Sequence, residues 1–142
     1  MIEYVLGFVF CGDQVLLKRK CKGPEINIGK WNGIGGKVEP FDADPAISMD
    51  REAHEEVNFG GDETDALDEW FHHGFFCGTG YRVQVFSTTL FGPMSWVETR
   101  EENEPVAFFD SKKNHDENAY NLNWLIQLCI QKSTFEVQEH AR

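Results

Sequence analysis

The chain has 142 residues, 41% of them hydrophobic and 13% aromatic, and a formal net charge of −11. Its length suits one domain, and its composition excludes a largely disordered chain. The acidic balance opposes binding to nucleic acid, whose phosphates require clustered lysine and arginine. No apolar run approaches about 18 residues, so we expect no membrane span. The apolar N-terminus lacks the basic start of a signal peptide and is predicted to be a strand.

The four cysteines, at positions 11, 21, 77 and 129, are widely spaced and form no CxxC pair. This spacing favours reduced thiols in a cytoplasmic protein over a metal knuckle or a disulfide framework. The acidic chain would repel an anionic substrate unless something local offset the repulsion. A divalent cation or the basic segment KRKCK at 18–22 could do so.

The N-terminal third is predicted to begin with two strands, at residues 2–10 and 15–20. The segment CGDQ at 11–14 contains a Gly-Asp turn signal, so a hairpin is expected there. Residues 21–37 are rich in Gly, Lys and Asn, and they should form a loop with a short strand near its end.

A helix is predicted to follow over residues 44–57. Asp44 and Pro45 suit the N-cap and first helical positions. Asn58 and the glycines at 60–61 can supply the left-handed conformation that ends a helix.

The C-terminal half is predicted to hold an acidic loop at 62–69, strands at 69–77 and 81–91 around a GTG turn, and a short strand at 105–110. A last helix follows, because apolar residues recur at the spacing of one buried face: Leu122, Leu125, Ile126, Cys129 and Ile130. Strands divided by one inner helix and closed by a terminal helix indicate a mixed α/β or α+β domain.

The inner helix concentrates acidic residues beside its apolar stripe. On a helical wheel, the stripe consists of Ala46, Met49, Ala53 and Val57. Glu52, Glu55 and Glu56 occupy the adjoining sector, because they are i,i+3 and i,i+4 neighbours, so their carboxylates can converge. Like charges repel there, and hard oxygen ligands around Mg²⁺ would turn the repulsion into binding. The pattern alone leaves two interpretations open, a solvated acidic face and a cation site.

The flanking sequence adds a resemblance. Residues 35–59, GGKVEPFDADPAISMDREAHEEVNF, resemble the Nudix box of the MutT/Nudix hydrolases, written G-x5-E-x7-R-E-U-x-E-E-x-G-U with U a bulky apolar residue. The matching positions are Gly36, Arg51, Glu52, Ala53, Glu55, Glu56 and Phe59. The chain departs from the pattern in three ways: Asp42 replaces the first Glu, eight residues instead of seven separate it from Arg51, and Asn58 replaces a glycine.

The resemblance implies a fold and a domain organisation. It implies an α+β domain, an α/β/α sandwich with a mixed sheet between the box helix and a C-terminal helix. One domain would occupy residues 1–142, with a core at about 2–132 and a short C-terminal tail. The segment KWNGIGGK at 30–37 is also similar to the corresponding part of the oxidised-purine nucleoside triphosphatases.

The resemblance also implies Mg²⁺-dependent cleavage of a nucleotide pyrophosphate linkage, with Mn²⁺ as an alternative ion. Metal ligands would be the Gly36 carbonyl, Glu52, Glu55 and Glu56. Glu52, held by Arg51, is the first choice for general base, and a glutamate of 101–104, best Glu104, is the alternative.

Three further residues are candidates for substrate binding. Lys37 could contact phosphate, Asn32 could hydrogen-bond a base edge, and Trp31 could stack on a base. The expected substrate is an ordinary, oxidised or modified nucleoside triphosphate, bound by a monomer or homodimer. The alternatives are ADP-ribose or another nucleoside-diphosphate sugar, and a non-catalytic nucleotide-binding module. The diphosphate-sugar alternative is weakened because enzymes with that activity often carry a proline about sixteen residues past the box, and this chain has none there.

Overall fold

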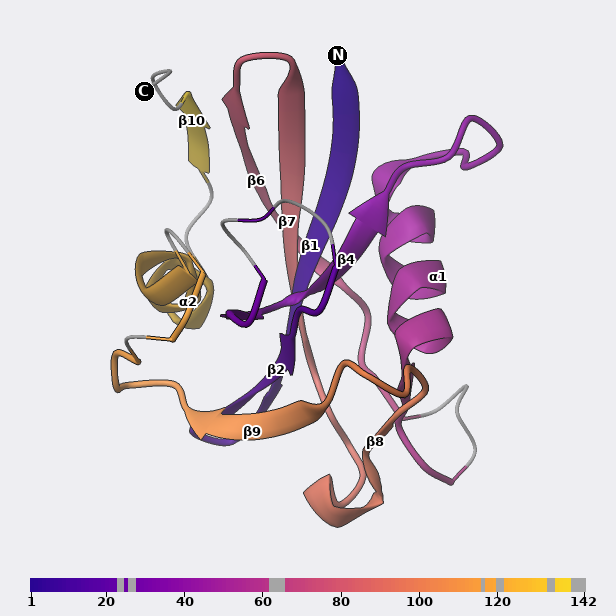
Figure 1. Ribbon diagram of the computed structural model, residues 1–142, viewed down its shortest axis with the longest axis vertical. Helices are drawn as coiled ribbons and strands as arrows, with labels where there is room; N and C mark the ends of the chain where they lie inside the picture. Colours follow the sequence, from indigo (N-terminus) through magenta and orange to yellow (C-terminus); the bar gives the residue numbers. More distant parts are fainter. Residues whose placement is uncertain are drawn as a thin grey trace.

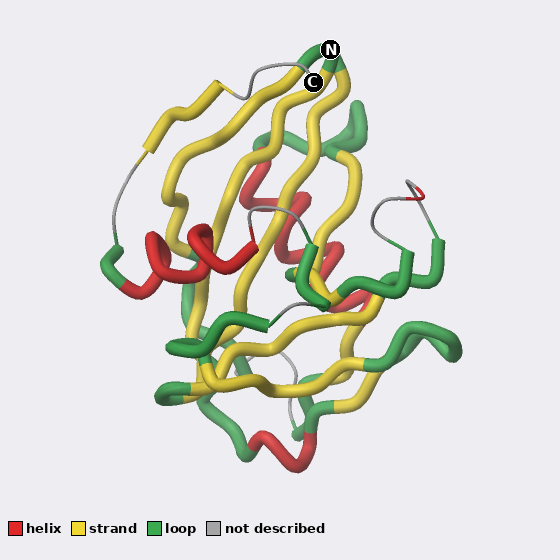
Figure 2. Tube along the Cα trace, turned by 60° about the vertical axis from the view of Figure 1, so that its left-hand side comes forward, coloured by secondary structure: helices red, strands yellow, loops and turns green. Residues whose placement is uncertain are grey.

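The computed structural model describes residues 1–22, 25, 28–61, 66–115, 117–119 and 122–132, and the backbone of 135–138. A mixed β-sheet lies between two helices, α1 (Pro45–Glu56) and α2 (Leu122–Ile130). Figure 1 shows the helices on opposite sides of the strands, and Figure 2 shows the same layers from another direction. The predicted α/β/α sandwich is confirmed.

The main sheet has eight strands, and six of them follow the order β10-β6-β7-β1-β2-β3. β4 pairs with β1, and β9 pairs with β2. The bounds are β1 (Ile2–Cys11), β2 (Gln14–Arg19), β3 (Trp31–Asn32), β4 (Ile34–Lys37), β6 (Phe71–Gly78), β7 (Tyr81–Thr89), β9 (Val106–Asp110) and β10 (Phe135–Gln138). A second, two-stranded sheet joins β5 (Val57–Asn58) to β8 (Glu98–Thr99), and a short 3₁₀ helix, η3, spans Met94–Trp96.

Both predicted hairpins form. β1 and β2 are antiparallel and turn at Gly12, whose φ is 57°. β6 and β7 are antiparallel and turn at Gly80, whose φ is 82°. Such positive φ values are readily adopted by glycine, which has no Cβ. β1 and β7 run parallel, and the long segment of chain that connects them includes α1.

The strands present alternate side chains to the two helices. On the α1 side, Val9 of β1 and Leu16 of β2 pack with Met49 and Ala53 of the helix. On the α2 side, Phe8 of β1 belongs to a second core with the helix residues Leu122, Leu125, Ile126 and Cys129. This period of two gives the sheet two buried faces.

The predicted start of α1 is confirmed. The Asp44 carboxylate caps the helix by accepting hydrogen bonds from the amides of Ala46 (2.8 Å) and Ile47 (3.3 Å), and Pro45 is the first helical residue. The prediction that Ala46 belongs to the buried stripe is wrong, since Ala46 is exposed. Ser48 is buried in this part of the helix instead, where its hydroxyl donates to Asp42.

The predicted end of α1 is wrong in its detail. Val57 has an extended backbone (φ −135°), and Asn58 does not adopt positive φ. These two residues leave the helix directly as β5, because their backbones pair with β8. The left-handed residues are Gly60 and Gly61, with φ of 81° and 55°.

The C-terminal helix agrees with its prediction except at its last residue. Ile130, expected on the buried face, is 41% exposed, because α2 ends there beyond the core. Residues 135–138, expected in the C-terminal tail, form β10 and pair in parallel with β6. Part of the predicted acidic loop, residues 62–65, lies outside the described residues.

Two expectations about the environment can be compared with the structure. Cys11, Cys21, Cys77 and Cys129 are all free thiols, as expected. Neither helix in the described part of the chain has the length and apolar character needed to cross a membrane.

We expect α2 to depend on its inner face. Leu125→Ala should lower the free energy of unfolding by about 2–5 kcal/mol, because it leaves a cavity in the second core. Ile130→Ala, at the exposed end of the same helix, should cost about 1 kcal/mol or less. Denaturant unfolding of both variants measures the difference. Equal losses would contradict the described position of α2.

Candidate metal and catalytic site

The Glu52 carboxylate lies directly over Gly36. A Cβ atom added to Gly36 would fall 2.5 Å from Cδ of Glu52 and 2.6 Å from each of its carboxylate oxygens. The Glu52 carboxylate can therefore occupy this position only because residue 36 lacks a side chain. Gly36 and Glu52 were both predicted as metal ligands, and the structure brings them together.

Glu56 lies one helical turn further along α1 and is 6% exposed. One carboxylate oxygen accepts a hydrogen bond from Lys18 Nζ at 2.8 Å, and the other accepts one from the Gly35 amide at 3.3 Å. Glu55, by contrast, has a 58% exposed side chain. The solvated-face interpretation thus describes Glu55, but it does not describe Glu56.

The crowding of carboxylates changes the acidity of Glu52. Burial, and after it the negative charges of Glu56 and Glu55, raise the pKa of Glu52 to about 7, although the charge of Arg51 opposes the rise. Burial likewise raises the pKa of Glu56, although Lys18 opposes it. Each group is harder to ionise here than in water, so a cation placed among them would be stabilising.

Arg51 is held by a residue outside the helix. Its guanidinium donates to the Asp42 carboxylate at 2.7 Å and to Glu52 at 3.3 Å, and it lies over the ring of Phe41, 5.4 Å from the centroid. The predicted contact with Glu52 is present, and Glu55 is 3.9 Å away.

Asp42, whose place in the box is irregular, is the anchor of this arrangement. Its side chain is 2% exposed and accepts hydrogen bonds from the Ser48 hydroxyl (2.6 Å), the Glu39 amide (2.8 Å) and Arg51. The Ser48 hydroxyl, the Glu39 amide and Arg51 together lower the pKa of Asp42 despite its burial. The extra residue in the loop therefore leaves Asp42 able to bind Arg51.

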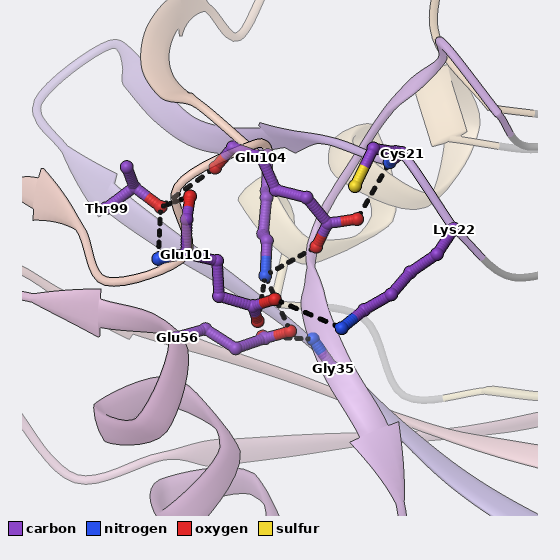
Figure 3. Close-up of polar contacts among 8 residues, drawn as sticks. Cys21, Lys22, Gly35, Glu56, Thr99, Glu101 and Glu104 are labelled. Carbon is purple, nitrogen blue, oxygen red and sulfur yellow. Dashed lines mark hydrogen bonds and ion pairs between the residues drawn. The ribbon is translucent and has the colours of Figure 1, made fainter.

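A second acidic group comes from the loop after β8. Figure 3 shows Glu101 and Glu104 of this loop pointing toward Glu56 at the end of α1. Oxygens of the three carboxylates lie within 4.8 Å of one another. Lys18 Nζ contacts all three, at 2.8 Å from Glu56, 2.7 Å from Glu101 and 3.0 Å from Glu104. We call these four residues the Lys18 cluster.

Glu104, the alternative base, is almost fully buried in this cluster. Its second oxygen accepts a hydrogen bond from the Cys21 amide at 2.7 Å. Burial alone would raise the pKa of Glu104, but the Cys21 amide and Lys18 outweigh it and hold the pKa at about 2. Such a carboxylate is a weak proton acceptor near neutral pH.

The candidate substrate residues lie in the short strands β3 and β4. Trp31 packs edge-on against Phe109, with ring centroids 4.8 Å apart, and belongs to the α2-side core. The Asn32 side chain accepts a hydrogen bond from the Gly33 amide at 2.8 Å. Lys37 is exposed at the end of β4, next to Gly36. Their roles in substrate binding stay predictions.

Lys18 does not have the environment that the sequence predicts. It belongs to the basic segment 18–22, which could offset a substrate's charge, yet it is fully buried and paired with the protein's own carboxylates. A signal was available, since Lys18 stands two residues after Leu16 in β2 and so shares the α1-facing side of that strand.

Comparison with protein families gives a match between residues 3–125 and the model of the NUDIX domain. The chain belongs to the Nudix family. A search of curated protein sequences gives no significant match.

Solved structures agree with this Nudix fold. A NUDIX hydrolase from Nitrosomonas europaea superposes with a TM-score of 0.76 at 15% identity, covering 99% of this chain and 79% of that one. A MutT protein from Bacillus halodurans gives 0.65 at 15% identity, with 99% and 90% covered. A bifunctional NMN adenylyltransferase/ADP-ribose pyrophosphatase from Francisella tularensis, in complex with AMP and a manganese ion, gives 0.68 at 15% identity, with 92% and 41% covered.

Nudix hydrolases use divalent metal ions, and the residues of this chain fit one. The carboxylates of Glu52 and Glu56 and the carbonyl of Gly36 are hard oxygen donors of the kind that Mg²⁺ and Mn²⁺ prefer. The glycine cradle under Glu52 and the raised pKa of that carboxylate both agree with a cation beside it.

The paired glycines of β4 allow a matched test of the site. Gly36→Ala should displace the Glu52 carboxylate, whose end can swing away, so the fold should persist while Mn²⁺ binding weakens by roughly 10–100-fold. Gly35→Ala should instead collide with the backbone carbonyl of Val5 and destabilise the protein by on the order of 1–3 kcal/mol.

Calorimetric Mn²⁺ titration and thermal unfolding of both variants separate these effects. Unchanged Mn²⁺ affinity in a folded Gly36→Ala protein would contradict the placement of the ion beside Gly36.

Proposed function

We propose that this Nudix hydrolase is a Mg²⁺-dependent pyrophosphohydrolase that converts an ordinary, oxidised or otherwise modified nucleoside triphosphate into a monophosphate and pyrophosphate. The observation that carries the proposal is the Glu52 carboxylate seated over Gly36 beside the buried Glu56. Mn²⁺ is the alternative ion. We further propose that it acts as a monomer or homodimer. We also propose a cytoplasmic location, which the four free thiols favour.

The residues that would hold the ion are Glu52, Glu56 and the Gly36 carbonyl, with Glu55 at the solvent edge. A bound divalent ion supplies charge neutralisation for the pyrophosphate and lowers the pKa of a nearby water. The carboxylates of the chain cannot neutralise the pyrophosphate, because they carry the same sign of charge as the substrate.

Glu52 is the proposed general base. Its carboxylate accepts a proton from water as the water oxygen bonds to a phosphorus of the α–β anhydride, and the bridging P–O bond breaks to release pyrophosphate. Arg51 fixes the carboxylate, and Asp42 fixes Arg51. Glu104 is less suited to this role, because both its oxygens already contact Lys18 and the Cys21 amide.

The substrate would enter from the side of β3 and β4. Lys37 is exposed beside Gly36, where its ammonium can reach phosphate. Asn32 and Trp31 lie on the neighbouring short strand and are the proposed contacts to the base. The similarity of segment 30–37 to the oxidised-purine nucleoside triphosphatases supports a triphosphate substrate.

Product analysis on a nucleotide panel tests the proposal. With Mg²⁺, the protein should convert at least one ordinary or oxidised nucleoside triphosphate to monophosphate and pyrophosphate, and chelation of the metal should abolish turnover. Release of AMP and ribose phosphate from ADP-ribose as the dominant activity would replace the triphosphate assignment. Inertness on every compound would favour a non-catalytic nucleotide-binding module.

Single substitutions test the assigned residues. Glu52→Gln and Glu56→Gln should each lower kcat by roughly 10²–10⁴-fold, because they remove a proton acceptor or a metal ligand. Glu98→Gln, at an exposed position of β8, is the matched control and should retain activity. Wild-type rates in both site variants would refute the enzymatic role of the box.

A further inference from the structure

The Lys18 side chain supplies a positive charge from the protein itself at the buried end of the acidic site, among Glu56, Glu101 and Glu104. Its ammonium is 2.7–3.0 Å from oxygens of three carboxylates that arrive from two separate parts of the chain, α1 and the loop after β8. The side chain is fully buried, and its ammonium is enclosed by these three carboxylates.

The loop that carries Glu101 and Glu104 is organised by its own hydrogen bonds. The Thr99 hydroxyl donates to the Glu104 carbonyl at 2.8 Å, and the Arg100 amide donates to the Glu56 carbonyl at 2.8 Å. These bonds shape the loop and dock it at the end of α1, yet they do nothing to reduce the repulsion among three carboxylates. Among the described residues, Lys18 is the cation in contact with all three.

A divalent ion cannot share this position. Mg²⁺ would need the same oxygens at about 2.0–2.1 Å, and the Lys18 ammonium already lies between them. A second positive charge beside the ammonium would also be repelled. On the opposite side of Glu56, toward Glu52 and Gly36, Arg51 contacts Glu52 at 3.3 Å and Glu55 at 3.9 Å, and no ion pair among the described residues joins it to Glu56.

We propose that Lys18 is a positioning residue that substitutes for a metal ion at the inner end of the site, fixes the 98–104 loop against α1, and confines divalent metal to the Gly36–Glu52–Glu56 side. The inference rests on the proposed function in one respect, the binding of a divalent ion by Glu52 and Glu56. It does not depend on which nucleotide is hydrolysed.

Counting bound Mn²⁺ by electron paramagnetic resonance, without nucleotide, tests the inference. The wild-type protein should bind one ion per chain. The double variant Lys18→Met/Glu104→Gln removes one positive and one negative charge, so the net charge of the cluster is unchanged while its centre becomes vacant. This variant should bind a second ion close to the first, visible as a doubled stoichiometry and a dipolar-broadened spectrum.

A matched control is Lys22→Met. The Lys22 ammonium is 3.5 Å from Glu101, but its side chain is 75% exposed, so its loss should leave one ion bound with unchanged affinity. Thermal unfolding should show a larger Mn²⁺-induced rise in Tm for the double variant than for the wild type, because metal replaces the lost ammonium.

The outcomes separate the two proposals. A wild type that binds no Mn²⁺ would overturn the metal site and this inference together. A wild type that binds two ions without nucleotide, or a folded double variant that binds one ion with wild-type affinity, would overturn the role of Lys18 alone. If the double variant does not fold, the number of Mn²⁺ ions bound by the wild type decides: one ion per chain supports the role of Lys18, and two ions overturn it.

Discussion

Repulsion among carboxylates at the C-terminal end of α1 is the constraint on which the rest of the site depends. Glu52 and Glu56 share one face of the helix, and the negative end of the helix dipole adds to their crowding. Isolated carboxylates removed from water cost several kcal/mol each. The structure meets this cost with two anchored cations, Arg51 on the outer side and Lys18 on the inner side.

The surrounding elements place these charges. β4 brings Gly36 under Glu52, where a side chain at this position would displace the Glu52 carboxylate. β2 delivers Lys18 because its alternation puts that residue on the face that packs against α1. The pairing of β5 with β8 ties the end of the helix to the loop that supplies Glu101 and Glu104. A short two-stranded sheet thereby determines which acids meet.

Much of the fold follows from local signals in the sequence. Asp44 and Pro45 mark the start of α1, the turns at Gly12 and Gly80 mark the hairpins, and Leu122 to Cys129 mark the inner face of α2. These features depend on neighbours in the chain, so a linear pattern records them. The end of α1 was mispredicted because Val57 and Asn58 respond to β8, some forty residues further along.

The site divides in the same way. Glu52, Glu56 and Gly36 could be named because helical spacing and the box pattern relate them directly. The contact of Arg51 with Asp42 crosses an irregular loop, and the contact of Lys18 with Glu101 and Glu104 crosses most of the chain. Charge composition does not predict such pairings. A lysine among basic neighbours is expected to be exposed, and only the alternation of side chains along β2 indicates that Lys18 faces the interior.

The most direct test of the account is the position of a metal ion in a crystal of the protein grown with Mn²⁺. Anomalous scattering locates manganese without reference to the chain. The account predicts a peak within coordination distance of the Glu52 and Glu56 carboxylates and the Gly36 carbonyl, with the Lys18 ammonium still between Glu56, Glu101 and Glu104. A peak at the centre of the Lys18 cluster, with the lysine displaced, would contradict it.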